Sequence, residues 1–142
     1  YQFYNLGRLW QDIEAAREAG LHLVAIVPPN ASDERVARIA GLTSGYTYLL
    51  SRVGITGTDH ASGTPAERII RDLERAKAPP ALLGFGISTP EHVRRALEAG
   101  AAGVIVGSAL VKIVSEHLGD RDAMHKALGS AAVSFKAATR TA

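Results

Sequence analysis

The stretch ALLGFGISTPEHVRRALEAGAAGVIVGSALVK, residues 81–112, contains one pattern twice: an apolar run, a glycine and a helix-like segment. The apolar runs at residues 81–85 and 103–106 predict strands, and the segments after them predict helices. Consecutive strands with a helix between them pair in parallel through right-handed crossovers. This stretch therefore predicts an α/β fold.

The rest of the chain continues this alternation of strand and helix. Apolar runs predict two further strands, at residues 21–27 and 46–50. Start and stop signals, such as Ser32, the capping box at residues 64–67 and Gly100, mark the helix ends. The predicted helices lie at residues 11–19, 33–40, 64–77, 89–100, from 108, and 120–138.

Four strand–helix units fit two architectures. One is half of a (β/α)8 TIM barrel, and the other is a small doubly wound sheet. Strands that are apolar on both faces agree with either, because helices cover the sheet in both. In either case we expect residues 1–142 to form a single domain.

Two glycine segments mark the candidate binding site. Gly84-Phe85-Gly86 follows the third predicted strand, and Gly107-Ser108 follows the fourth, each leading into a helix-like segment. Glycine lets a backbone N–H approach a ligand, and a helix start presents unpaired N–H groups. Each segment alone is also typical of a tight turn, but the placement after consecutive strands matches the phosphate sites of barrels. The pair predicts a phosphate-bearing small-molecule ligand, with Ser108 adding a hydroxyl donor.

Tyr48 and the loop after it each have two interpretations. Tyr46 and Tyr48 share one face of their strand, where aromatic rings either fill the core or flank a ligand. The polar loop at residues 53–63 is either a plain surface loop or a lid over the site.

Several other chemistries lack support in the sequence. The G-x-G-x-x-G nucleotide fingerprint and the P-loop are absent. The five histidines have no metal-ligand spacing and the chain has no cysteine, so we expect no metal and no organic cofactor. No carboxylate stands at the C-terminal end of a predicted strand, where a barrel enzyme places its acid and base.

Composition narrows the class of partner. The net charge is +2, and the basic residues recur at helical spacing without interleaved aromatics, so we expect no nucleic-acid binding. The longest apolar stretch, residues 99–111, is too short to span a bilayer, so we expect no membrane partner. The first 20 residues lack the pattern of a signal peptide. The absence of cysteine favours a cytoplasmic location.

Residues 45–57, GYTYLLSRVGITG, closely resemble the sixth-strand signature of the tryptophan synthase alpha subunit family. Residues 28–30 resemble the end of the family's fifth strand, and residues 84–88 resemble its seventh strand. Residues 103–112 resemble the eighth strand with the short helix that follows it, and residues 136–140 resemble the C-terminal end. The resemblance runs from residue 14 to residue 140 and covers the C-terminal half of the family's chain, strands five to eight.

The resemblance implies a fold, a reaction and a set of site residues. The family is a (β/α)8 TIM barrel, so this chain is expected to be a half-barrel of four parallel strand–helix units. The reaction is a lyase step of tryptophan biosynthesis, the retro-aldol cleavage of indole-3-glycerol phosphate to indole and glyceraldehyde 3-phosphate. The matched motifs imply that the phosphate is bound by Gly57, Gly86, Gly107 and Ser108. They imply that the substrate cavity is lined by Tyr48, Thr56 and Phe85.

The sequence also departs from the family. The family's catalytic glutamate and aspartate belong to its second and third strand regions, which have no counterpart here, so no catalytic residue is assigned. We expect the 142-residue chain alone to lack the lyase activity. Most loops that dock on the beta subunit belong to the same missing half. Residues 1–5 do not fit the family, and Thr58-Asp59-His60 stands where the family usually has an arginine.

Four strands cannot close a barrel, so a half-barrel has two unpaired edges and an open apolar face. Such a surface calls for a partner. The partner we expect is a second copy of the chain, giving a homodimer, or a complementary N-terminal half. The alternative function is therefore a non-catalytic phosphate-binding half-barrel module that forms a homodimer. A phosphate-handling barrel of histidine biosynthesis fits the residues around Tyr48 and Thr56 less well.

Overall fold

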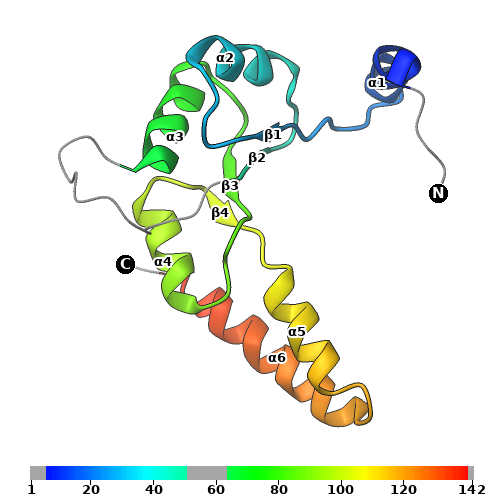
Figure 1. Ribbon diagram of the computed structural model, residues 1–142, viewed down its shortest axis with the longest axis vertical. Helices are drawn as coiled ribbons and strands as arrows, with labels where there is room; N and C mark the ends of the chain where they lie inside the picture. Colours follow the sequence, from blue (N-terminus) through cyan, green and yellow to red (C-terminus); the bar gives the residue numbers. More distant parts are fainter. Residues whose placement is uncertain (1–5, 51–63, 141–142) are drawn as a thin grey trace.

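The computed structural model describes residues 6–50 and 64–140 (Figure 1). Strands and helices alternate along these residues as the sequence predicts. The elements are η1 (Leu6–Arg8), α1 (Leu9–Glu18), β1 (Ile26–Val27), α2 (Asp33–Leu42), β2 (Thr47–Leu49), α3 (Pro65–Arg75), β3 (Ala81–Leu83), α4 (Pro90–Glu98), β4 (Gly103–Val104), α5 (Ser108–Glu116) and α6 (Arg121–Ala137).

The four strands form one parallel sheet in the order β1-β2-β3-β4. Each strand therefore lies beside the strand that follows it in the chain. A doubly wound sheet reverses its strand order at a switch point, and the described sheet contains no such reversal. The structure thus decides between the two predicted architectures in favour of the half-barrel, with α2, α3 and α4 on the same side of the sheet (Figure 1).

One face of the sheet carries the apolar core. Val27, Leu49 and Leu83 stand in register on neighbouring strands, and all three are buried. They pack with apolar side chains of α2, α3 and α4, namely Val36, Ile69, Leu73, Val93 and Ala96. Successive residues of a strand point to opposite faces, so the next row, which includes Ile26 and Tyr48, faces away from these helices.

Local capping explains where four of the helices begin. The N-cap side chains of α2, α3, α4 and α6 each accept a hydrogen bond from the backbone N–H three residues later. These N-caps are Ser32, Thr64, Thr89 and Asp120. At α3 the predicted capping box is complete, because Glu67 Oε2 also accepts from the Thr64 N–H at 3.2 Å. The predicted starts of these helices are confirmed.

The paired strands are shorter than the apolar runs that predict them. The run at residues 21–27 pairs as β1 only at its last two residues. Gly45, with φ +87°, turns the chain just before β2, so residues 21–24 have no neighbouring ladder. The Ala25 carbonyl oxygen accepts the Tyr48 N–H at 2.9 Å, where the ladder begins. Leu23 instead donates its N–H to Ser44 Oγ at 3.0 Å and accepts the Ser44 N–H at 2.8 Å. The apolar run predicted the extended segment but not the extent of its pairing.

The described residues contain one sheet with one apolar core. That residues 1–142 form a single domain stays a prediction. None of the helices in the described ranges is long and apolar enough to cross a membrane.

We predict that Leu49→Ala lowers the free energy of unfolding by about 2–5 kcal/mol, because it leaves a cavity in a fully buried row. Val133→Ala, on a side chain of α6 that is 71% exposed, serves as the control and changes stability by less than about 0.5 kcal/mol. Urea unfolding of both variants measures the difference. Equal effects would mean that Leu49 does not lie in the core.

Candidate functional site

The candidate site lies at the carboxyl ends of β2, β3 and β4. Because parallel strands all point the same way, the segments that follow them meet at one edge of the sheet. The loop after β2 includes Thr56 and Gly57, and both lie outside the described residues. The structure places the other predicted site residues, namely Tyr48, Phe85, Gly86, Gly107 and Ser108, at or after these strand ends.

The N-terminus of α5 is open to a ligand. Its N-cap is Gly107, which offers no side-chain hydrogen bond, in contrast to the N-caps of α2, α3, α4 and α6. Gly107 and Ser108 are exposed, and a Cβ atom built on Gly107 meets nothing within 4 Å. The first N–H groups of a helix have no partner within the helix, and they form the positive end of its dipole. This arrangement suits an anion.

The turn after β3 is held by Tyr48. The Tyr48 hydroxyl donates to the Gly84 carbonyl oxygen at 3.1 Å. The ring lies against the Gly84 Cα, so that a Cβ atom at residue 84 would collide with it. Two residues later Gly86 has φ +78°, a conformation that residues with a side chain rarely adopt. The Gly84–Gly86 segment therefore needs glycine for two different reasons.

The turn at Gly86 leads into α4, which begins at Pro90 as the sequence predicts. The hydroxyl of its N-cap, Thr89, accepts the His92 N–H at 3.3 Å. Gly86 thus lies in a turn before a capped helix. Of the two helices that follow β3 and β4, only α5 begins without a side-chain N-cap bond.

Two aromatic side chains border the turn. Tyr48 is half-buried on the face of the sheet opposite the helices, and Phe85, just after β3, is 48% exposed. Tyr48 lies on β2, and Phe85 follows the end of the neighbouring strand β3. Their role in binding substrate stays a prediction.

The charged groups near the turn are paired with one another. Glu91, in the first turn of α4, accepts hydrogen bonds from Arg94 at 2.8 Å and Arg95 at 3.1 Å. The hydrogen bonds from Arg94 and then Arg95 hold the pKa of Glu91 below its ordinary value. Glu91 therefore forms ion pairs with two arginines of its own helix and is not a free acid or base.

In the part of the chain that the structure describes, no carboxylate stands directly at a strand end. Within residues 6–50 and 64–140, every aspartate and glutamate lies in a helix or, for Asp120, at the start of α6. The arrangement can therefore bind and orient an anion, but it shows no carboxylate placed to move a proton.

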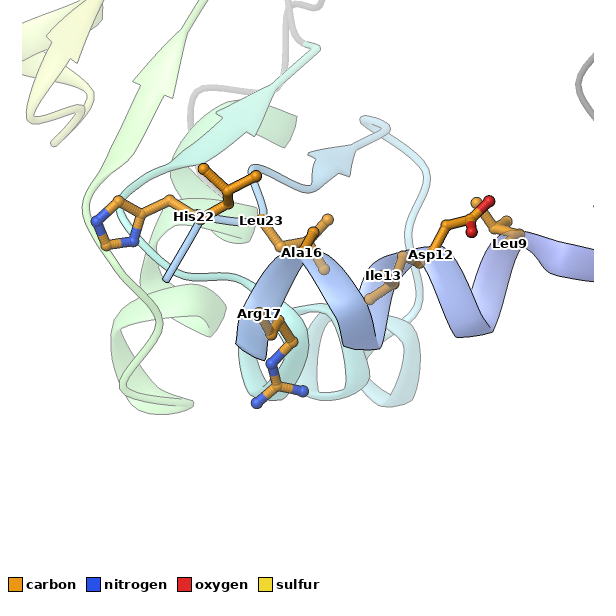
Figure 2. A pocket seen from close by; sticks show the side chains of 8 residues that line it. Leu9, Asp12, Ile13, Ala16, Arg17, His22 and Leu23 are labelled. Atoms are coloured by element: carbon orange, nitrogen blue, oxygen red, sulfur yellow. The ribbon is translucent and has the colours of Figure 1, made fainter. Parts of the chain in front are cut away.

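A surface cavity of about 250 Å³ lies elsewhere in the molecule (Figure 2). The side chains of Leu9, Ile13 and Ala16, from α1, line one side of it. Residues 21–23, which line the other side, precede β1 and so lie toward the amino end of the strand. This position separates the cavity from the strand ends that carry the candidate site.

Two features of the site do not follow from the sequence patterns. The contact between Tyr48 and Gly84 joins residues 36 apart in the chain, and no local pattern signals it. The histidine spacing indicates only a surface or packing role for His92, yet its ring contacts Ser88 in the turn. A local signal exists in this second case, because His92 is the third residue after the predicted cap at Thr89, where side chains often reach back to the backbone.

Comparison with known proteins identifies a family. The family model for the tryptophan synthase alpha chain matches residues 9–140. The chain is 50% identical over 128 residues to the tryptophan synthase alpha chain of Vibrio vulnificus, and the match covers 90% of this chain and 48% of that relative. It is 49% identical over 126 residues to the corresponding protein of Photobacterium profundum, with 89% and 47% covered.

A solved structure agrees with these sequence relatives. A mutant tryptophan synthase alpha-subunit from the hyperthermophile Pyrococcus furiosus superimposes with a TM-score of 0.72 at 34% identity. The superposition covers 95% of this chain and 53% of that one. The chain thus spans about half the length of the relatives it matches.

We predict that alanine destabilises the chain at one glycine of the site and has little effect at another. Gly84→Ala lowers the free energy of unfolding by about 1–3 kcal/mol, because the new methyl group displaces the Tyr48 ring. Gly107→Ala changes stability by less than about 0.5 kcal/mol, because the methyl group enters open space. Urea unfolding of the two variants tests this. A Gly84→Ala chain as stable as the parent would show that Tyr48 does not pack on this turn.

Proposed function

This chain belongs to the tryptophan synthase alpha chain family, and from that premise we propose that it supplies the phosphate-binding half of a site that cleaves indole-3-glycerol phosphate. The observation that carries the proposal is the uncapped start of α5 at Gly107, beside the turn at Gly86 on the neighbouring strand. In this proposal the N–H groups at Gly86, Gly107 and Ser108 bind the phosphate, and Gly57 completes the set.

The chemistry of the reaction separates phosphate binding, which this chain would supply, from proton transfer. Retro-aldol cleavage breaks the carbon–carbon bond between indole and the glycerol phosphate chain, so one group must donate a proton and another must accept one. Backbone N–H groups at a helix start bind the phosphate and fix its position, but they do not exchange protons with the reacting atoms. Tyr48, Thr56 and Phe85 would line the indole end of the cavity.

The acid and base must then come from outside the described residues. We propose that they belong to a complementary half, as the family's catalytic glutamate and aspartate belong to strand regions that this chain does not match. The chain alone would bind ligand without releasing indole. An association with a beta subunit and a cytoplasmic location are part of the same proposal.

We predict that Ser108→Glu abolishes phosphate binding without unfolding the chain. A glutamate in the first turn of a helix is favourable for the helix dipole, but it repels a phosphate at the same N–H groups. Titration of the ¹⁵N-labelled chain with glycerol 3-phosphate should shift the amide signals of Gly86, Gly107 and Ser108. Ser108→Glu should weaken binding by at least about tenfold, or 1.4 kcal/mol.

The matched control is Ser130→Glu, which makes the same charge change at an exposed position within α6. We expect it to bind glycerol 3-phosphate as the parent does. Equal weakening in both variants would show that net charge, rather than the α5 start, controls binding. Unchanged affinity in Ser108→Glu would remove this residue from the site.

A second function is favoured by the open face of the sheet. Ile26 is 56% exposed on that face, and β1 and β4 each have a strand neighbour on one side only within the described sheet. A two-fold axis would place β4 of one copy beside β1 of the other at two equivalent junctions and keep all strands parallel. The second candidate is therefore a non-catalytic, phosphate-binding homodimer.

Light scattering after gel filtration tests this candidate. A homodimer gives a mass near twice 15.0 kDa, and Ile26→Lys, which places a charge in the joined face, should give monomers. A monomer that unfolds cooperatively would contradict the homodimer. Release of indole from indole-3-glycerol phosphate by the chain alone would contradict a non-catalytic module.

A further inference from the structure

His92 contacts the turn that precedes its own helix. Its ring atom Nδ1 lies 3.3 Å from the Ser88 backbone nitrogen and 3.3 Å from Ser88 Oγ. A backbone N–H can only donate a hydrogen bond, so Nδ1 is the acceptor. In the neutral ring the proton then lies on Nε2.

This contact is not needed to cap α4. The Thr89 hydroxyl already accepts the His92 N–H, which is the usual N-cap bond. In α3 the corresponding third residue, Glu67, reaches back to the N–H of its own N-cap, Thr64. In α4 the side chain reaches one residue further, to Ser88, and so secures the chain ahead of the helix.

The turn is held at three points around Gly86. On one side, the Tyr48 hydroxyl holds the Gly84 carbonyl group. On the other side, the Ile87 side chain is only 3% exposed within the core, and His92 holds the Ser88 N–H. Phe85 and Gly86 are the exposed residues between these contacts.

We propose that His92 is a positioning residue, which holds the Gly86 turn in the conformation that binds the ligand's phosphate. The inference rests on the proposed function, because His92 can position the turn for a phosphate only if the turn binds phosphate. A turn that is already ordered loses less conformational entropy when the ligand binds, so fixing Ser88 raises affinity without any contact between His92 and the ligand.

Two substitutions separate the hydrogen bond from the bulk of the ring. His92→Leu keeps an apolar side chain of similar size and removes the acceptor. His92→Asn places the amide oxygen on Cγ, where Nδ1 is attached, and so restores an acceptor at the same distance from the backbone. Asp120→Ala is the control, because it removes the N-cap acceptor of α6, whose bond to the Ala123 N–H is 2.9 Å long, far along the chain from the turn.

The affinity of each 142-residue variant for glycerol 3-phosphate is measured by NMR titration at pH 8. We expect His92→Leu to bind about three- to tenfold more weakly, as one lost hydrogen bond predicts, and His92→Asn to recover the parent's affinity within about twofold. Asp120→Ala should be less stable and bind equally well. A long-range ¹H–¹⁵N spectrum of the parent should show the His92 ring proton on Nε2.

The outcomes distinguish the inference from the proposed function. If the parent binds and His92→Leu binds equally well, His92 has no positioning role and the phosphate site stands. If His92→Asn is as weak as His92→Leu, the hydrogen bond to Ser88 is not the cause and the inference is overturned. If the parent shows no binding, the proposed phosphate site itself fails, and the inference fails with it.

Discussion

Burial of one face of the sheet against α2, α3 and α4 is the interaction on which the rest of the structure depends. Val27, Leu49 and Leu83 stand in one row and face the same helices. This shared core fixes the strands in parallel and in register, so their carboxyl ends meet at one edge. The turn at Gly86 and the start of α5 are neighbours only because of that arrangement.

The helices could be predicted from the sequence more accurately than the strands. Ser32, Thr64 and Thr89 mark helix starts through contacts with residues three positions away, so a short window of sequence contains the whole signal. The extent of a strand depends on its neighbour. Residues 21–24 have the apolar character of a strand, but Ser44 and Gly45 decide that they do not join the ladder.

The glycines of the candidate site show the same limit. Their positions after consecutive strands predicted a binding site, yet the reason for each glycine appears only in three dimensions. Gly84 makes room for the Tyr48 ring, Gly86 adopts a positive φ, and Gly107 leaves open space at a helix start. The Tyr48 ring comes from another strand, so no pattern within the glycine segment could have distinguished these reasons.

The sequential order of the strands has a consequence for how the chain folds. In this sheet every strand pairs only with strands adjacent to it in the chain, so each pairing closes a loop no longer than one strand–helix unit. Contacts between residues close in sequence cost less loop-closure entropy and favour fast folding. Folding can therefore begin at any one pair of neighbouring units, such as β2-α3-β3, and extend unit by unit toward both edges, as it does in repeat proteins.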